Sequence, residues 1–294
     1  MIEIDVVIAT FNREDSIIEA IENVLQYRND IRKIIIIVNG SNDNTLEYLN
    51  KYSGEEKIEI ISSKINLGAS GGKNLGMRKS TADLLVILDD DAEFYSANPF
   101  EEIRNIFYEN DRIGLIQFSI VNYHTKKIKK HEFPGKSILL NSDKEFLISS
   151  YTGAGHAIRK TMLDSIGYYD ELFFYAHEEL DLSFRIIENG WDMKYVPAIK
   201  IYHKVSSKGR LPGKQVIGMM MMNRMIISYR YLPFKHFLIS SVLWFFKTIL
   251  WSKSFFLPIK IIKSFMKSMN SINRKVISES TINYMKENNG RLWY

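Results

Sequence analysis

Three consecutive aspartates, Asp89-Asp90-Asp91, directly follow the apolar run 84–88 and carry the strongest chemical signal in the chain. This pattern predicts a buried strand with an anionic tip. Packing so many like charges together is unfavourable. Divalent cations offset it, because Mg²⁺ and Mn²⁺ take oxygen ligands, often one or two carboxylates together with phosphate. The aspartates therefore indicate either a metal and phosphate site or a polar turn at the end of a strand.

Three other segments could take part in such chemistry. Glu178, Glu179 and Asp181 open a predicted helix over 178–189, where the helix dipole favours acids and where a carboxylate facing a cleft can also act as a general base. His203 ends a short predicted strand, and an imidazole beside carboxylates is a good Mn²⁺ ligand, although a lone histidine is usually structural. The glycine-rich segment 66–76 is either a flexible loop or a close approach to a ligand, and it matches neither the P-loop nor the dinucleotide fingerprint.

The elements that must position these residues alternate between strands and helices. Short apolar runs at 4–9, 34–38, 58–61 and 84–88 predict strands, and 13–27, 45–52 and 74–80 predict helices or parts of them. This order indicates a doubly wound, mainly parallel α/β sheet, whose ligands lie beyond the carboxyl ends of the strands. Residues 10–13, 39–43 and 89–91 follow three of those ends. Further strands are expected at 114–121 and 153–159, and two short ones, 193–196 and 199–203, around Pro197.

Charge divides the chain of 294 residues into two parts. Residues 204–294 hold 16 Lys and Arg but only two acids, whereas the preceding residues are net acidic. Such a tail is expected to meet an anionic partner, either nucleic acid or a membrane. Its aliphatic and Met-rich composition favours a membrane or subunit contact over nucleic acid. The absence of cysteine excludes disulfides and thiolate metal sites, and the first residues do not resemble a signal peptide.

The tail itself is predicted to be helical. Residues 219–232 fit a helix that stops before Pro233, and the apolar run 237–251 is short for a bilayer span, which needs about 20 residues. One helical face over 259–276 is apolar, with Lys260, Lys263 and Lys267 on the opposite side. This pattern is typical of a helix lying in a membrane interface. A helix packed on its own domain, or on a second copy in a homodimer, would show the same pattern.

Taken together, these segments resemble the inverting family 2 glycosyltransferases of GT-A fold. The resemblance covers about residues 3–205 and follows the family's order through segments 7–13, 39–45, 66–76, 88–91, 153–155, 166–173, 178–185, 190–191 and 196–203. It is strongest toward the bacterial branch that includes rhamnosyl- and galactofuranosyltransferases. It implies a sugar donor carried on a nucleoside diphosphate, UDP or dTDP, and a Mn²⁺ or Mg²⁺ cofactor.

The resemblance also assigns roles to residues. Donor-binding positions are Thr10, Asn12, Arg13, Asn39, Asp43, Gly68, Lys73, Asp89 and Asp90. The metal would be held by Asp91, Asp89 and His203, and the acceptor by Gly153, Ala154, Gly155 and Asp181. Glu179 occupies the position of the catalytic base, with Glu178 as the other carboxylate of the pair. Asn39 stands where many relatives carry an aspartate that reads the base.

The sequence thus predicts an enzyme that transfers a sugar to a hydroxyl of a glycan or polyprenyl-linked acceptor in bacterial surface polysaccharide synthesis. We expect a nucleotide-sugar half (1–110), an acceptor half (111–209) and a basic helical tail (210–294), in a cytoplasmic protein that is peripheral on the inner face of the cell membrane. Two other classes fit parts of the pattern: a sugar nucleotidyltransferase, and a non-catalytic membrane-bound scaffold for glycan assembly. A glycoside hydrolase fits the paired carboxylates but has no need of a diphosphate site.

Overall fold

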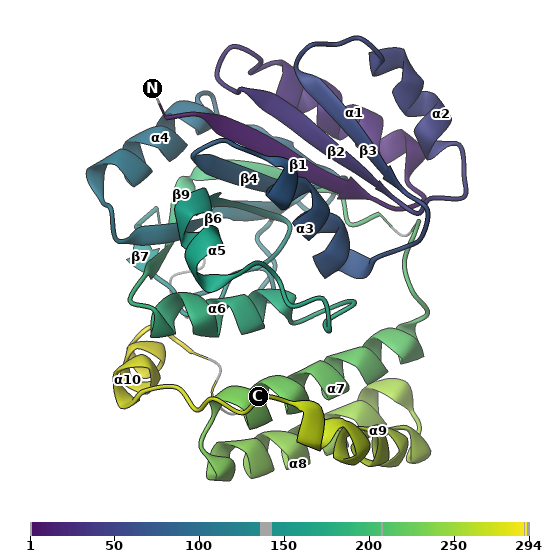
Figure 1. Ribbon diagram of the computed structural model, residues 1–294, viewed down its shortest axis with the longest axis vertical. Helices are drawn as coiled ribbons and strands as arrows, with labels where there is room; N and C mark the ends of the chain where they lie inside the picture. Colours follow the sequence, from purple (N-terminus) through teal and green to yellow (C-terminus); the bar gives the residue numbers. More distant parts are fainter. Residues whose placement is uncertain (1, 136–142, 207, 291, 293–294) are drawn as a thin grey trace.

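The computed structural model describes residues 2–135, 143–206, 208–290 and 292, and its centre is a single mixed sheet (Figure 1). The strand order is β3-β2-β1-β4-β8-β6-β9-β5, and β7 pairs with β9. The strands are β1 (Ile4–Thr10), β2 (Lys33–Asn39), β3 (Ile58–Ser63), β4 (Leu84–Asp89), β5 (Ala92–Phe94), β6 (Ile113–Asn122), β7 (Phe146–Leu147), β8 (Gly155–Arg159) and β9 (Asp192–His203). The predicted α/β architecture is confirmed, with four parallel strands in the first half. In the second half β6 and β9 are parallel, and the other pairings are antiparallel.

The parallel strands end together at one edge. In the register of β1 with its two neighbours, Ala9 lies opposite Asp89 and Thr10 lies opposite Val38. These strands are apolar on both faces because helices cover both sides of the sheet. Val6 and Ile8 of β1 belong to one core, and Val7 between them belongs to the other. The alternation fixes which side chains face each layer and leaves only the strand ends for polar chemistry.

Helices form two layers. The first core contains α1 (Glu14–Leu25), α2 (Thr45–Leu49) with the 3₁₀ turn Asn50–Tyr52, and α4 (Pro99–Glu109). The second contains α3 (Gly68–Lys79), α5 (Lys160–Ile166) and α6 (Glu178–Glu188). The tail helices α7 (Gly213–Tyr231), α8 (Phe234–Ser252) and α9 (Phe256–Ser268) join this second core, and a 3₁₀ turn (Met269–Ser271) and α10 (Glu279–Glu287) follow. In Figure 1, α7 lies between α8 and the rest of the molecule.

The glycine-rich segment is mostly helix. The helix that was predicted over 74–80 begins at Gly68, whose φ of +74° and whose contact with the Phe174 carbonyl exclude a side chain. Gly76 faces the sheet, where an added Cβ would lie 2.5 Å from Val7 Cγ1. The glycines therefore bring α3 close against β1 and β2.

One prediction on the second half of the sheet is wrong. Residues 192–203 form the single strand β9 instead of two strands separated by Pro197. Phe118 of β6 pairs with Val196, whereas Ser119 pairs with Lys200, so residues 197–199 bulge out of the ladder. Pro197 has no N–H to donate, and a bulge accommodates it without ending the strand.

The apolar helix face predicted over 259–276 is also wrong beyond Ser268. After the 3₁₀ turn, the N–H groups of Lys275 and Ile277 donate to the carbonyls of Arg230 and Tyr231, at the end of α7. This pairing satisfies carbonyls that a helix terminus leaves free. Within α9 the buried side is Pro258, Ile261 and Phe265, and Met266 is exposed. No helix in the described ranges combines the length and apolarity needed to cross a bilayer.

We expect Gly76→Ala to destabilise the protein by about 1–3 kcal/mol, because the new methyl group must displace Val7 in a filled core. Thermal unfolding followed by circular dichroism measures the change. Gly213→Ala is the matched control, since nothing lies within 4 Å of its Cβ position. An unchanged melting temperature for Gly76→Ala would contradict the close packing of α3.

Candidate active site

The aspartate tip lies at the carboxyl end of β4, where Asp89 is partly exposed and Asp90 and Asp91 are buried. Arg13 Nη1 donates to Asp90 Oδ1 at 2.5 Å and lies 3.3 Å from Asp91 Oδ2. Burial raises the pKa of Asp90 to about 6, although Arg13 opposes the rise. Burial also disfavours the charged form of Asp91, but His203 and Arg13 outweigh it and lower that pKa to about 2. The tip thus keeps Asp91 ionised.

Asp89, Asp91 and His203 form a candidate cation site. One ligand atom from each lies within 4.8 Å of the others. Asp91 Oδ1 is buried without a hydrogen-bond partner, although His203 Nε2 lies 3.3 Å from it. An unsatisfied buried carboxylate oxygen beside a second carboxylate and an imidazole is suited to Mn²⁺ or Mg²⁺. The residues present therefore fit the divalent cation that the sequence predicts.

Glu132 is a candidate site residue that sequence reasoning missed. Its Oε1 lies 2.6 Å from His203 Nδ1, and its side chain is buried. A carboxylate on the second ring nitrogen of a metal-binding histidine fixes the ring orientation. Burial alone would lower the pKa of His203, but Asp91 and Glu132 raise it to about 10. No local signal marks Glu132, because it follows the basic loop 126–130 and lies 71 positions from its partner.

Three predicted donor residues lie beside the aspartates. Thr10 ends β1 with a buried side chain, and Arg13 pairs with Asp90. Asn12 has a left-handed φ of 52°, and it exchanges hydrogen bonds with Ser41 and Asn42, at the end of β2. The loops after β1 and β2 are thus tied together above the sheet edge.

Two other predicted donor residues have structural hydrogen bonds. The Asn39 amide accepts from Leu67 N–H and donates to the Gly68 carbonyl, each at 2.9 Å, so it holds the start of α3. Asp43 accepts from the Thr45 N–H and hydroxyl at the start of α2. Their roles in donor binding stay predictions.

Lys73 lies between the aspartate tip and α6. Its buried ammonium is 3.0 Å from Asp89 Oδ1 and donates to the Gly153 carbonyl at 3.2 Å. Burial lowers the pKa of Lys73, but Asp89, Tyr169 and Glu179 outweigh burial and raise it above its ordinary value. The Lys73 ammonium therefore interacts with carboxylates from both β4 and α6.

Residues 153–155 contact both Asp89 at the end of β4 and Glu179 of α6. An added Cβ on Gly153 would lie 2.3 Å from Glu179 Oε1, and one on Gly155 would lie 2.3 Å from Ile201 Cδ1. Ala154 is buried, and its carbonyl accepts from Asp89 N–H at 3.0 Å. The three small residues thus bring the base position and the aspartate tip close to one backbone segment.

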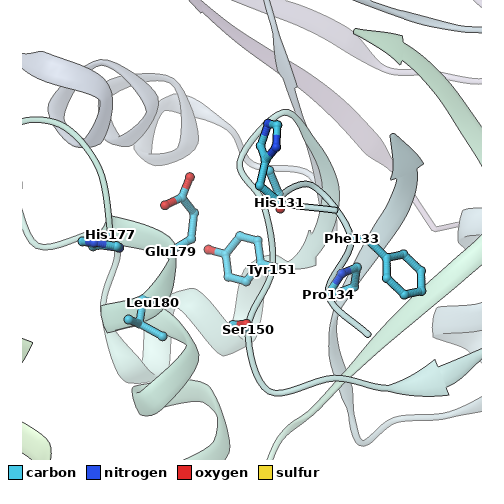
Figure 2. A pocket seen from close by; sticks show the side chains of 9 residues that line it. His131, Phe133, Pro134, Ser150, Tyr151, His177, Glu179 and Leu180 are labelled. Atoms are coloured by element: carbon cyan, nitrogen blue, oxygen red, sulfur yellow. The ribbon is translucent and has the colours of Figure 1, made fainter. Parts of the chain in front are cut away.

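A cavity of about 160 Å³ opens beside Glu179. Figure 2 shows its walls, which come from α6 and the preceding turn on one side and from loops around 131–134 and 150–152 on the other. The lining residues are His131, Phe133, Pro134, Ser150, Tyr151, Thr152, His177, Glu179 and Leu180. Burial raises the pKa of both Glu178 and Glu179, and Lys73 opposes the rise. Of the two glutamates, Glu179 is the one that lines the cavity.

The structure places Asp181 away from this cavity. Its Oδ1 accepts from Arg230 and Tyr231 of α7, and its Oδ2 accepts from Arg185. Oδ1 thus joins α6 to α7, whereas Oδ2 pairs with Arg185 within α6, and the contact with an acceptor stays a prediction.

The turn before α6 is also held by the tail. Ala176 and His177 both have left-handed φ angles, of 70° and 69°. Asn223 of α7 donates to the carbonyls of Tyr175 and Ala176 at 2.9 and 2.7 Å. Left-handed backbone is costly outside glycine and persists where surrounding contacts impose it. The tail thereby sets the orientation of Glu179.

Comparison with known families agrees with this geometry. The model of Glycosyl transferase family 2 matches residues 5–167. The chain belongs to this family. A relative in Haemophilus influenzae, an uncharacterized protein, is 28% identical over 169 residues, which are 56% of this chain and 91% of that protein. The poly-beta-1,6-N-acetyl-D-glucosamine synthase of Staphylococcus aureus is 24% identical over 200 residues, and the chain spans about half of its length (47%), with 65% of this chain covered.

Solved structures share the fold. GalNAc-T7 with UDP, GalNAc and Mn²⁺ has a TM-score of 0.65 at 14% identity, covering 82% of this chain and 51% of that one. The mannosyltransferase of Pyrobaculum calidifontis with GDP-Man and Mn²⁺ has a TM-score of 0.61 at 12% identity, covering 97% and 79%. Staphylococcus aureus TarS 1-349 with UDP-GlcNAc has a TM-score of 0.57 at 13% identity, covering 80% and 69%. The family 2 transferase is thus an enzyme with a GT-A-like α/β fold and C-terminal helices.

We expect Glu132→Gln to weaken Mn²⁺ binding by roughly 10- to 100-fold, because the amide orients the His203 ring less strongly than the carboxylate. Titration of the protein with Mn²⁺, followed by electron paramagnetic resonance, measures the free ion. Glu171→Gln, at a half-exposed site, is the control. Wild-type affinity in Glu132→Gln would remove this residue from the cation site.

Proposed function

We propose that this family 2 enzyme is a metal-dependent inverting glycosyltransferase that uses a UDP- or dTDP-sugar donor. The observation that carries the proposal is the placement of Asp89–Asp91 and Glu179 on the two sides of Lys73 and Gly153. This arrangement supports a diphosphate site at the aspartates with a general base, Glu179, next to it. The structural neighbours support a nucleotide-sugar donor and a Mn²⁺ cofactor, because they hold UDP with Mn²⁺, GDP-Man with Mn²⁺, or UDP-GlcNAc.

At the donor end, Asp91, Asp89 and His203 would hold the divalent cation, which supplies positive charge to a departing diphosphate. Thr10 and Arg13 border this position. Arg13 pairs with Asp90 and Asp91, so it could turn to the donor phosphates once a cation offsets the charge of Asp91. The ion pair with Lys73 holds the Asp89 carboxylate in place.

At the acceptor end, Glu179 accepts the proton of an acceptor hydroxyl held in the cavity. The oxygen of that hydroxyl forms a bond to the anomeric carbon, while the bond from that carbon to the diphosphate oxygen breaks. The diphosphate leaves with the bonding electrons, and attack from the opposite face inverts the configuration. Burial keeps the pKa of Glu179 above its ordinary 4.5, which makes it a stronger base toward a hydroxyl.

We propose a glycan or polyprenyl-linked acceptor of bacterial surface polysaccharide synthesis, handled by a peripheral protein at the inner face of the cell membrane. The resemblance to rhamnosyl- and galactofuranosyltransferases and the likeness to poly-N-acetylglucosamine synthases lead to different sugars. A panel of UDP-GlcNAc, UDP-galactofuranose and dTDP-rhamnose, assayed for release of the nucleoside diphosphate, tests the donor. Release of inorganic diphosphate instead would identify a nucleotidyltransferase.

Two substitutions separate the donor and acceptor roles. We expect Asp91→Ala to abolish Mn²⁺-dependent turnover because it removes a cation ligand. Glu179→Gln should lower kcat by about 10²–10⁴-fold while donor affinity stays near wild type, because an amide cannot accept the proton. Steady-state kinetics and calorimetric donor titration measure the two quantities. Asp164→Asn, on the surface of α5, is the control. Full transfer activity in Glu179→Gln would exclude Glu179 as the base.

The pH profile reports the base directly. Glu179 must be ionised to act, so kcat should rise with pH through an acid limb with an apparent pKa above 4.5. Lys73 lowers the pKa of Glu179, so Lys73→Met should move this limb to higher pH. An acid limb that stays in place in Lys73→Met would contradict the electrostatic link between the two groups.

A further inference from the structure

Helix α8 buries a largely polar side and exposes an apolar side, which is the reverse of an ordinary surface helix. Apart from Phe237, its buried positions recur every four residues and are largely polar or half-polar: His236, Ser240, Trp244, Thr248 and Ser252. Its solvent side is apolar, and Val242, Phe246 and Leu250 there are 55%, 60% and 75% exposed. A helix on a water-exposed surface normally has the reverse arrangement.

Specific contacts fix this orientation. Arg224 of α7 is buried, and its Nε donates to Ser240 Oγ at 3.3 Å. The Trp244 ring meets the His177 ring edge-on, with 5.5 Å between centroids. Because α8 is held through its polar side, its apolar side remains outward.

The exposed apolar surface continues beyond α8. It includes the corner between α8 and α9, where Phe255 and Phe256 are 59% and 80% exposed. We define the apolar face as Phe234, Leu238, Ile239, Val242, Leu243, Phe246, Leu250, Trp251, Phe255 and Phe256. Contiguous patches of this kind mark interaction sites.

Positive charge accompanies the apolar face. Lys235 lies in the first turn of α8, Lys253 follows its last residue, and the exposed Lys260, Lys263 and Lys267 lie along α9. Residues 204–278 contain no Asp or Glu. Two copies joined through this face would bring two lysine sets together without an acid to neutralise them. An anionic surface is complementary to both features.

We propose that the apolar face inserts into the interface of an anionic membrane, with α8 and the α8–α9 corner as the inserted elements and the α9 lysines at the headgroups. This location differs from the apolar side of α9, which the sequence favoured but which packs partly inward. Figure 1 shows α8 on the side of the tail away from the sheet.

Helix α8 also contacts a residue that lines the candidate acceptor cavity. His177 lines that cavity, and Trp244 on the buried side of α8 contacts it. If the proposed transfer reaction holds, docking through α8 brings the cavity close to an acceptor anchored in the membrane. The docking itself does not depend on that reaction.

Vesicle flotation of the full chain tests the proposal. Wild type should float with vesicles of 70% phosphatidylcholine and 30% phosphatidylglycerol, and bind pure phosphatidylcholine at least tenfold more weakly. Val242→Ser/Phe246→Ser should reduce binding to anionic vesicles at least tenfold through loss of insertion. Lys260→Glu/Lys263→Glu/Lys267→Glu should do so through loss of charge attraction.

Controls separate this result from misfolding and from the transfer reaction. Tyr108→Ser removes an 80% exposed aromatic from α4 and should leave flotation unchanged. Melting temperature and donor hydrolysis in detergent-free buffer should match wild type in the Val242/Phe246 variant. Failure of wild type to float, or equal flotation of that variant, would overturn the proposal. A dimer in light scattering that the same variant dissociates, without flotation, would assign the face to a second copy.

Discussion

The balance of charge at the end of β4 is the constraint on which the rest of the site depends. Three adjacent carboxylates end one strand, and two of them are buried. Arg13, Lys73 and His203 approach them from three different parts of the chain. Each brings its own element into position, namely the loop after β1, the helix α3 and the end of β9. Neutralising one acidic cluster therefore assembles the edge of the sheet.

Glu132 extends this balance toward the acceptor side. It bonds to His203, while its neighbours His131 and Phe133 line the cavity beside Glu179. The cation site and one wall of the cavity thus belong to a single short segment. On the opposite wall, Lys73 and Gly153 join Asp89 to the surroundings of Glu179. The proposed donor site and the proposed acceptor cavity are therefore linked by direct contacts on both walls.

Much of this could be predicted from the sequence, and the failures have physical reasons. The apolar runs and the aspartates at 89–91 placed the parallel strands and their functional edge, because burial on both faces leaves an unambiguous pattern. The roles predicted for Asn39 and Asp181 stay predictions, because a polar residue at a site edge can bind either a ligand or protein, and only the fold shows that both side chains also have protein partners. Glu132 could not be predicted because its partner, His203, is 71 positions away in the sequence. The outward apolar side of α8 was missed because its inward partners are themselves polar.

The contacts of Asn223, Arg230 and Tyr231 with α6 and the turn before it bear on the modularity of the enzyme. The tail is an internal brace, and its helices share one core with the sheet. A chain shortened before α7 would leave the carboxylate of Asp181 buried with fewer partners and the left-handed turn without its clamp. Swapping tails between related transferases would accordingly disturb the turn before Glu179, so the tail helices and the candidate base would have to diverge together.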